Sequence, residues 1–552
     1  MSQMLKSSSA MGIATMTSRI LGMVREIVYA NFMGDTPTAS AFKFAFQVPN
    51  LFRRLLGEGA LSAAFIPIFK NKEKNEGQEK MWEATNAVMS ALVSASSIII
   101  LIVVLGITVV LTFFGPTALH QTDQNNIASF ISGLSQSMSP GIISHQTALM
   151  LRLLRLMFPY MLLVCIAAAF MGILNSRGYF FIPAMGATML NIVMIASVVF
   201  LTPLFGTTLE TKIFALAVGV LLAGLAQVFF QYPFLVKEGY RPKWINPWKN
   251  PVVKEVVTKM IPGTIGVAAF QINVLIINTI AFWVDPRIVA SFDYAVRMME
   301  LPQGVFGISL ATYLLPTLSG FAAEKNYQEF RNTLVQGLKY LFFANTPASV
   351  LLCVCSEPII RLLFEHGRFD ATSTERAAFA LSCLAPGLIA FSSVNVLARA
   401  FYALGDTKTP MLTSSFCLCL NLFIAAWLIW PLKQGGLGIA NSITSLINAL
   451  LLAYALKRKL PKIDFSQLKS LALKLAIAGL ACGGGAWSVQ YTLTRIESGD
   501  SLLSKCINVF LPLSSGACVY LITAFALKIP QASEIINLIK ESMIKIKRAF
   551  FN

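Results

Sequence analysis

The chain has 552 residues, of which 56% are hydrophobic and 13% are charged. Soluble globular domains carry about 25% charged residues, so this composition excludes a soluble protein and predicts a polytopic membrane protein. The formal net charge is +18. We attribute it to basic cytoplasmic loops rather than to nucleic-acid binding, because such loops collect Lys and Arg.

The sequence predicts fourteen membrane-spanning helices, since each span needs about 20 mainly apolar residues. The predicted fold is therefore all-α. Two of these stretches are interrupted, the second by Pro49 and Gly57 and the eighth by Pro302 and Gly304. Broken helices are expected to face protein or a cavity, because their freed backbone groups need partners. The predicted spans are centred near Leu21, Val48, Ile98, Val164, Met194, Leu222, Ile276, Ser309, Ala348, Ala390, Phe423, Ile447, Ile477 and Leu513.

The distribution of basic residues predicts the orientation of the chain. Lys and Arg are concentrated after the second, sixth and twelfth predicted spans and in the C-terminal tail, whereas residues 115–150 contain neither. All the loops rich in Lys and Arg lie on one side of the membrane, so both termini are predicted to be cytoplasmic. The loop after the ninth span, with Arg361, Arg368 and Arg376, is the main exception. No cleavable signal peptide is predicted.

A weak internal repeat predicts two lobes of six helices. The segment Leu61–Lys72 resembles Ala311–Asn326, and Ala169–Asn191 resembles Ala400–Asn421. Because six spans separate the copies, both insert with the same orientation, as in transporters that move two lobes around a central site.

This repeat sets the predicted domain boundaries. We expect an N-terminal lobe at 1–237, a C-terminal lobe at 238–460 and two further helices at 461–530. The remaining segment, 531–552, alternates Ile, Leu and Met with lysines and is predicted to be a cytoplasmic amphipathic helix at the membrane surface.

Arginines inside the apolar stretches are the strongest functional signal. At the bilayer centre an arginine costs about 2.5–3.5 kcal/mol or more, so such residues usually face a protein interior or a water-filled cavity. The planar guanidinium binds phosphate oxygens in pairs and stays charged, which favours a diphosphate or a similar anion. The alternative for each arginine is a structural ion pair with a nearby carboxylate. The candidate cations are Arg19, Arg25, Arg53 and Arg297, and the candidate partners are Glu26, Glu58, Asp293 and Glu300.

No arrangement of residues indicates an enzyme. The three histidines, His120, His145 and His366, fall in predicted external loops, and neither a Walker A motif nor a metal-spaced cluster is present. The nine cysteines suggest neither disulfides nor zinc binding. We therefore predict a transporter without a cofactor. It would be driven by membrane voltage, the substrate gradient or an ion gradient, with Na⁺ or H⁺ left open as the coupling ion.

Three segments resemble the MurJ (MviN) family of lipid II flippases: Thr17–Glu26, Val48–Ala60 and Tyr294–Gly304. The resemblance implies the fold of the multidrug/oligosaccharidyl-lipid/polysaccharide (MOP) superfamily, with two six-helix lobes and two extra helices. It also implies export of the undecaprenyl-diphosphate-linked peptidoglycan precursor across the bacterial cytoplasmic (inner) membrane by alternating access, for cell-wall synthesis.

The resemblance also implies roles for particular residues. The essential cavity arginines of the family correspond to Arg19, Arg25, Arg53 and Arg297, and Glu300 matches an acidic position beside the last of these. The two C-terminal helices would form a groove for the polyprenyl tail. The implied partners are lipid II, the membrane, and proteins of cell-wall synthesis and division.

The sequence departs from the family at several polar positions. Ser40 stands where members often have an acidic residue, and Gln47 where some have lysine. A sodium site described for the family uses acidic residues in the seventh and eleventh spans. This chain offers Asn273, Asn278 and Asn421 there instead.

Two other functions remain as alternatives. A drug or polysaccharide exporter of the same superfamily would share the fold, but drug exporters favour cationic substrates, which an arginine-lined cavity repels. A non-transporting scaffold for cell-wall enzymes would have no need of broken, charged helices within the membrane.

Overall fold

The computed structural model describes residues 2–58, 60–115, 143–248, 250–496 and 501–534, without the side chains of 2–15, 56–64, 262–267, 269 and 496. Over these residues every regular element is a helix, which confirms the predicted all-α class. Nine of the described helices, or ten if one bent pair is counted, are long and apolar enough to cross a membrane.

The chain divides into two compact units, residues 1–290 and 291–552. The helix Pro251–Val284 belongs to the first of them, so this division does not coincide with the expected lobe boundary at residue 237. In unit 1 this helix packs against Ala60–Glu76 and Gln78–Phe114.

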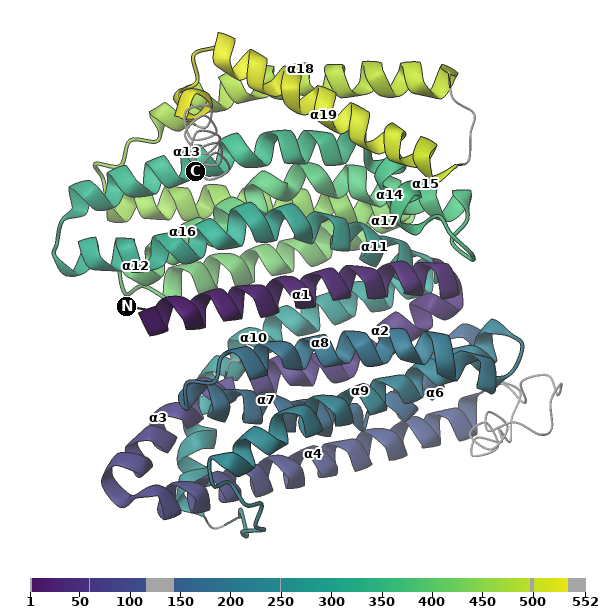
Figure 1. The fold of residues 1–552 in the computed structure, drawn as a ribbon, viewed down its shortest axis with the longest axis vertical. Coiled ribbons are helices and arrows are strands. Elements are labelled where there is room, and N and C mark those ends of the chain that lie inside the picture. The colour runs from purple at the N-terminus through teal and green to yellow at the C-terminus, as the bar shows by residue number, and fades with distance from the viewer. Residues whose placement is uncertain (1, 59, 116–142, 249, 497–500, 535–552) are drawn as a thin grey trace, which may run out of the picture. The chain divides into compact units, whose positions relative to one another are not determined.

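Unit 1 is a helical bundle in which α8 packs against both α1 and α9, and α7 packs against α9 (Figure 1). Near one end, Phe69, Trp82, Phe170 and Tyr240 form an aromatic cluster with ring centroids 5.4–6.0 Å apart. Its elements are α1 (Ser2–Met33), α2 (Pro37–Phe52), η1 (Arg53–Glu58), α3 (Ala60–Glu76), α4 (Gln78–Phe114), α6 (His145–Met157), α7 (Tyr160–Ser176), α8 (Phe181–Ala196), η2 (Ser197–Leu201), η3 (Thr202–Phe205), α9 (Leu209–Lys237) and α10 (Pro251–Val284).

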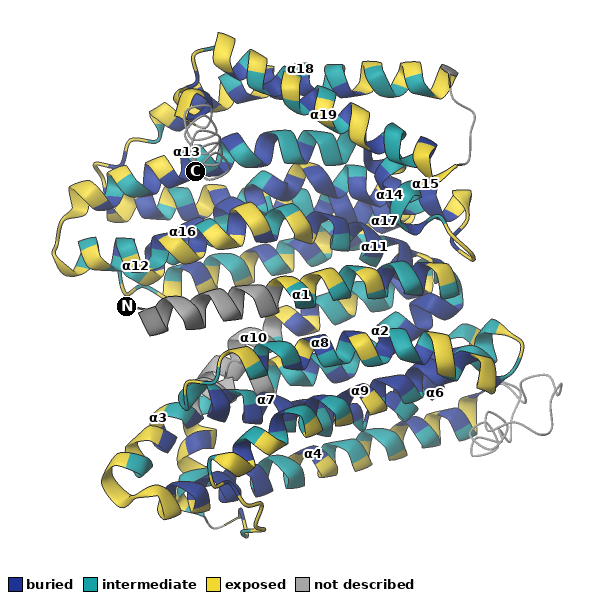
Figure 2. Cartoon of the chain, in the orientation of Figure 1, coloured by how far each residue is buried: buried dark blue, intermediate teal, exposed yellow. Residues whose placement is uncertain are grey.

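Helices α4 and α9 differ in how many of their apolar side chains are exposed. The most apolar window of α4 has a mean hydropathy of 3.0, yet only 11% of that window is buried. Leu101, Ile102 and Leu105 are more than half exposed. Helix α9 is buried along much of its length (Figure 2). Large exposed apolar side chains on a helix of this length indicate contact with lipid.

The two interrupted spans contain π-helical segments at the predicted places. In unit 1, η1 follows Pro49 and includes Gly57, and in unit 2, η4 (Gln303–Ile308) follows Pro302 and includes Gly304. π-Helical turns inside longer helices often mark functional sites. The predicted interruptions are therefore confirmed, and each lies next to or contains candidate site residues.

Unit 2 contains the remaining helices. Helices α18 and α19 pack against each other and against α13 (Figure 1). The Tyr520 hydroxyl on α19 donates a hydrogen bond to the Phe343 carbonyl on α13, at 2.7 Å. The elements are α11 (Ile288–Pro302), η4, α12 (Ser309–Ala323), α13 (Tyr327–Val354), α14 (Ser356–Phe364), α15 (Ala371–Leu384), η5 (Ala385–Gly387), α16 (Leu388–Ala403), α17 (Lys408–Lys459), α18 (Ser466–Ile496) and α19 (Leu502–Ala526).

Two C-terminal predictions stay open. The expected lipid-tail groove of helices α18 and α19 is a prediction about a ligand, which their packing alone does not test. The expected amphipathic tail, 531–552, lies outside the described residues from 535 onward.

An ion pair holds the turn between α16 and α17 to the far end of α17. Asp406 accepts a hydrogen bond from Lys459 Nζ at 2.8 Å and two from Thr409, one from its backbone N–H and one from its hydroxyl. The bond from Lys459 and then that from the Thr409 backbone hold the pKa of Asp406 well below its usual range. A carboxyl whose pKa is lowered by folding contributes stability above its unfolded pKa and loses it as the pH falls.

We therefore expect Asp406→Asn to lower thermal stability at pH 7, where the carboxylate is charged. Because an unfolded aspartate titrates near about pH 4, the difference between wild type and variant should shrink as the pH falls below that value. The thermal midpoints of the detergent-solubilised wild type and variant across pH 3–7 measure this difference. The Lys459→Gln variant should show an overlapping loss that does not add to that of Asp406→Asn. A difference in thermal stability between wild type and Asp406→Asn that does not change with pH would contradict the assigned stabilising role of the Asp406 carboxylate.

Candidate functional site

Arg25, on α1, is held by two side chains at once. Its Nη1 donates to Asn191 Oδ1 on α8 at 3.0 Å, and its Nη2 donates to Glu26 Oε1 at 2.5 Å. The guanidinium also lies 5.4 Å from the centre of the Tyr29 ring, a cation–π distance. With its side chain 13% exposed, Arg25 is a nearly buried cation in an apolar helix.

Glu26 is shared between two cations. Its Oε1 accepts from Arg25, and its Oε2 lies 3.5 Å from Lys43 Nζ on α2. The Glu26 and Lys43 side chains are 4% and 9% exposed. The Arg25 cluster, defined as Arg25, Glu26 and Lys43, therefore places two cations around one carboxylate in a nearly buried region.

Neighbouring contacts fix the two helices that carry the Arg25 cluster. The rings of Tyr29 on α1 and Phe42 on α2 meet edge to face with centroids 6.0 Å apart. On the other side, Asn191 Nδ2 donates to the Ser18 carbonyl at 3.1 Å, so α8 contacts both the backbone and the arginine of α1. Asn191 thus positions the guanidinium and its helix together.

The other candidate residues of unit 1 lie in different surroundings. Arg19 is exposed on α1, six residues before Arg25. Arg53 is the first residue of η1, which packs against α7. Glu58 ends η1, and its side chain lies outside the described residues. A role for these residues in substrate binding stays a prediction.

Arg297, on α11 in unit 2, contacts the two acidic residues expected for it. Its Nη1 donates to Glu300 Oε2 at 3.0 Å, and its Nη2 lies 3.9 Å from Asp293 Oδ1. The Arg297 and Glu300 side chains are 37% and 54% exposed. A role for Arg297 in substrate binding stays a prediction.

An aromatic cluster anchors α11 and so positions Arg297. Tyr294, one turn before it, is fully buried against Phe364 and Phe369, with ring centroids 5.0 and 5.3 Å away. Such aromatic contacts contribute about 0.5–1.5 kcal/mol each beyond the area that they bury. They hold one face of α11 against α14 and leave the Arg297 side chain part-exposed.

The residues that depart from the family pattern have structural partners here. The Ser40 hydroxyl is fully buried and accepts a hydrogen bond from the Ala290 backbone N–H at 3.0 Å. Asn278 Nδ2 donates to Gln47 Oε1 at 2.6 Å. Asn421 is buried within α17. These polar groups thus serve helix contacts inside each unit.

Two residues at this site were not predicted as site residues: Asn191, which accepts a hydrogen bond from Arg25, and Lys43, which belongs to the Arg25 cluster. A sequence signal existed for both, since each is polar within an apolar stretch, but their partner could not be deduced from spacing. A further buried cation, Arg152 on α6, is 6% exposed and was also missed. It lies in the first of two helices that meet at 45°, as in a broken span or a re-entrant loop.

No group of three or more His, Cys, Asp or Glu side chains that could hold a metal ion occurs within the described parts of the chain. Of the three histidines, His145 is the first residue of α6 and contacts Glu210 at 3.0 Å, and His120 lies outside the described residues. A coupling ion stays a prediction.

Comparison with known proteins identifies the family. A family model described as lipid II flippase MurJ matches residues 29–135 and 130–505 of the chain. A probable lipid II flippase MurJ of Vibrio cholerae serotype O1 is 32% identical over 510 residues, covering 90% of this chain and 92% of the relative. A probable lipid II flippase MurJ of Bdellovibrio bacteriovorus is 31% identical over 539 residues, covering 97% and 96%.

Solved structures agree with this fold. The chain superposes on a lipid II flippase MurJ in an inward closed conformation with a TM-score of 0.71 and 22% identity, covering 94% of this chain and 98% of that one. It also resembles an inward-facing multidrug resistance MATE family transporter of the MOP superfamily, with a TM-score of 0.62, 15% identity, and coverage of 80% and 94%. These likenesses show the fold, and the sequence matches show the family: the chain belongs to the MurJ family of lipid II flippases.

Proposed function

We propose that this protein moves lipid II, the undecaprenyl-diphosphate-linked peptidoglycan precursor, from the inner to the outer leaflet of the bacterial cytoplasmic membrane by alternating access. Membership of the MurJ family supports the transport function, and the chain matches its relatives over almost their whole length. The observation that carries the chemistry is the nearly buried Arg25 cluster, in which two cations share one carboxylate.

The substrate anion would bind the arginine of this cluster and the other candidate arginines. A diphosphate offers several oxygens to the two-pronged guanidinium, which binds phosphate more specifically than a point charge does. Glu26 occupies Arg25 in this structure, so binding requires Glu26 to share the guanidinium or to turn toward Lys43. The residues proposed to bind the diphosphate during the cycle are Arg19, Arg25, Arg53 and Arg297, supported by Glu26, Glu58, Asp293 and Glu300.

The proposed topology has fourteen crossings with both termini in the cytoplasm. This count takes α2–η1–α3 and α11–η4–α12 as one crossing each, and α17 as two crossings because its backbone breaks at Lys433. The basic loops after α3, α9 and α17 then all face the cytoplasm, as the distribution of Lys and Arg requires.

The driving force would act on the same charges. Moving one elementary charge fully across 100 mV changes the free energy by about 2.3 kcal/mol, so movement of the candidate arginines through the membrane field would depend on voltage. Binding of a diphosphate would add negative charge and so shift the preferred state. Na⁺ and H⁺ both remain candidates for a coupling ion.

The decisive experiment is translocation by the purified protein. Proteoliposomes containing fluorescent lipid II should gain externally accessible label several-fold faster with the protein than without it. A drug exporter would move a lipophilic cation instead, and a scaffold would move neither. Absence of lipid II movement, with the protein correctly folded by size-exclusion chromatography, would refute the proposal.

A further inference from the structure

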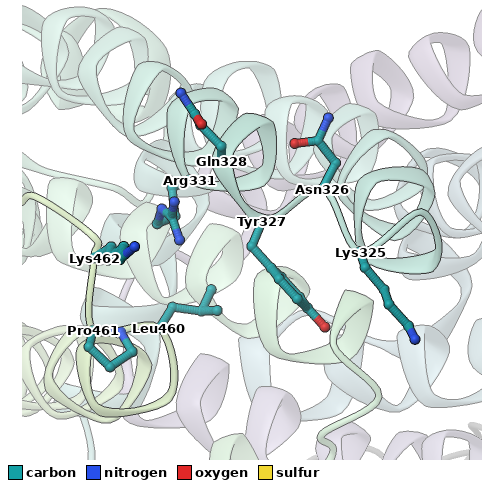
Figure 3. Close-up of a pocket in the computed structure, with 8 residues that line it drawn as sticks. All are labelled: Lys325, Asn326, Tyr327, Gln328, Arg331, Leu460, Pro461 and Lys462. Atoms are coloured by element: carbon teal, nitrogen blue, oxygen red, sulfur yellow. The ribbon is translucent and has the colours of Figure 1, made fainter.

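A cleft opens in unit 2 where the turn between α12 and α13 meets the segment that follows α17. Its volume is about 490 Å³, which lies within the usual range for small-molecule sites of about 300–1,000 Å³. The cleft is formed only by residues of unit 2. It is lined by Lys325, Asn326, Tyr327, Gln328, Arg331, Leu460, Pro461 and Lys462 (Figure 3).

The lining of this cleft, called here the Arg331 cleft, is strongly cationic. Three of its eight residues are Lys or Arg, and none is acidic. Figure 3 shows Arg331 and Lys462 on one side and Lys325 on the other, with the Tyr327 ring between them. None of these three cations makes a side-chain ion pair within the part of the chain that the structure describes. Their charges are therefore available to a ligand.

The backbone holds this lining in place. Lys325 adopts a left-handed conformation with φ of 57°, which turns the chain sharply at the end of α12. Asn326 then caps α13, accepting a hydrogen bond from the Glu329 backbone N–H at 3.2 Å. The cleft thus lies beside the N-terminus of a 28-residue helix, where the helix dipole adds to the attraction for anions.

The neighbouring acidic residues do not neutralise the cleft. Glu324 is the C-cap of α12 and Glu329 lies in the first turn of α13, but neither lines the cavity. Asp464, two residues after Lys462, accepts a hydrogen bond from the Ser466 backbone N–H and does not line the cavity either. The lining itself is therefore positive.

We propose that the Arg331 cleft binds a phosphate-bearing anion. Arg331 would bind two phosphate oxygens with its planar guanidinium, and Lys325 and Lys462 would act as point charges. The apolar surface of Leu460 and Pro461 beside these cations suits a ligand that joins a phosphate to a non-polar part, such as an anionic phospholipid with its acyl chains. A free phosphate compound shares the same chemistry. The proposal stands apart from the Arg25 cluster and does not depend on the transport function.

The test compares two triple variants that each remove two lysines and one arginine. The cleft variant carries Lys325→Gln, Arg331→Gln and Lys462→Gln. The control variant carries Lys74→Gln, Arg241→Gln and Lys254→Gln, which are exposed residues of unit 1 without a side-chain ion pair within the described residues. Both lose the same net charge, so a general electrostatic effect appears equally in the two.

Two binding measurements on the full-length protein distinguish the sources of phosphate. In one, native mass spectrometry measures the retention of phosphatidylglycerol. In the other, calorimetry measures the binding of inorganic phosphate in phosphatidylcholine nanodiscs. Because each basic residue near an anionic surface contributes substantially, the cleft variant should bind about 10-fold or more weakly than the control.

Each outcome decides the proposal. A selective loss of phosphatidylglycerol by the cleft variant supports a lipid ligand, and a selective loss of inorganic phosphate supports a soluble one. Equal binding by the cleft and control variants in both measurements would overturn the proposal. A cleft variant that keeps lipid II translocation while losing its anion would separate this site from the transport site.

Discussion

Arg25→Ala is expected to abolish rescue of growth in a bacterial strain depleted of its own lipid II flippase, and Arg25→Lys to rescue it only in part. The guanidinium donates to Asn191 and Glu26 at once. Lysine keeps the charge but lacks this two-pronged geometry. A hydrogen bond to a charged group contributes about 1.5–3 kcal/mol, so loss of such bonds from a binding step lowers the transport rate about 10-fold or more.

The matched control for this experiment is Arg241→Ala, which removes an exposed arginine from the loop after α9. It should rescue growth like the wild type. Immunoblotting of membranes must show equal amounts of each variant, because the loss of the Arg25 contacts to Asn191 and Glu26 also lowers stability. Full rescue by Arg25→Ala at normal abundance would remove the Arg25 cluster from the transport mechanism.

The sequence predicted those parts of the site that depend on local spacing. Glu300 lies three residues after Arg297 on a helix, so their contact could be expected before the fold was known. Glu26 follows Arg25 directly and was a candidate partner only by its proximity along the chain. The interruptions at Pro49 and Pro302 could also be predicted from the sequence, because proline removes a helical hydrogen bond. Each is followed by a π-helical segment.

The rest of the site depends on which helix faces lie together, and that information is not local. Asn191 reaches Arg25 across 166 residues of sequence, and Ser40 accepts from the Ala290 backbone across 250. Lys43 was visible as a charge in an apolar helix, but its partner Glu26 lies on another helix. The assignment of α10 to unit 1 likewise follows from tertiary packing.

For helix α17 the sequence predicted two spans but not how closely they pack against each other. Two spans were predicted here, and the structure joins them at Lys433, whose φ of 48° and ψ of −125° break the helix. Asn421 Nδ2 contacts Asn441 Oδ1 at 3.1 Å, and Asn448 Nδ2 contacts Ser414 Oγ at 3.4 Å. The earlier residue of the first arm, Ser414, thus contacts the later residue of the second arm, Asn448. This order of contacts shows that the two arms form an antiparallel hairpin.

Gly436→Ala is expected to destabilise this hairpin strongly. A Cβ at Gly436 would lie 2.3 Å from the Leu428 carbonyl oxygen and 2.6 Å from its carbon. These are backbone atoms of the opposite arm, so a side-chain rotation cannot relieve the overlap. Overpacking costs about 1–3 kcal/mol even where side chains can adjust, and the cost here should reach or exceed the upper end of that range.

The measurement is the thermal midpoint of the detergent-solubilised protein, read by fluorescence-detected size-exclusion chromatography after heating. Gly320→Ala is the matched control, because it is also a helical glycine but a Cβ there meets no atom within 4 Å. Alanine favours a helix over glycine by about 0.5–1 kcal/mol, so the control should melt at the same temperature or slightly higher. The midpoint of Gly436→Ala should fall by several degrees. Equal melting of the two variants would mean that the arms of α17 lie farther apart than this hairpin requires, and the two crossings assigned to it would need a different packing.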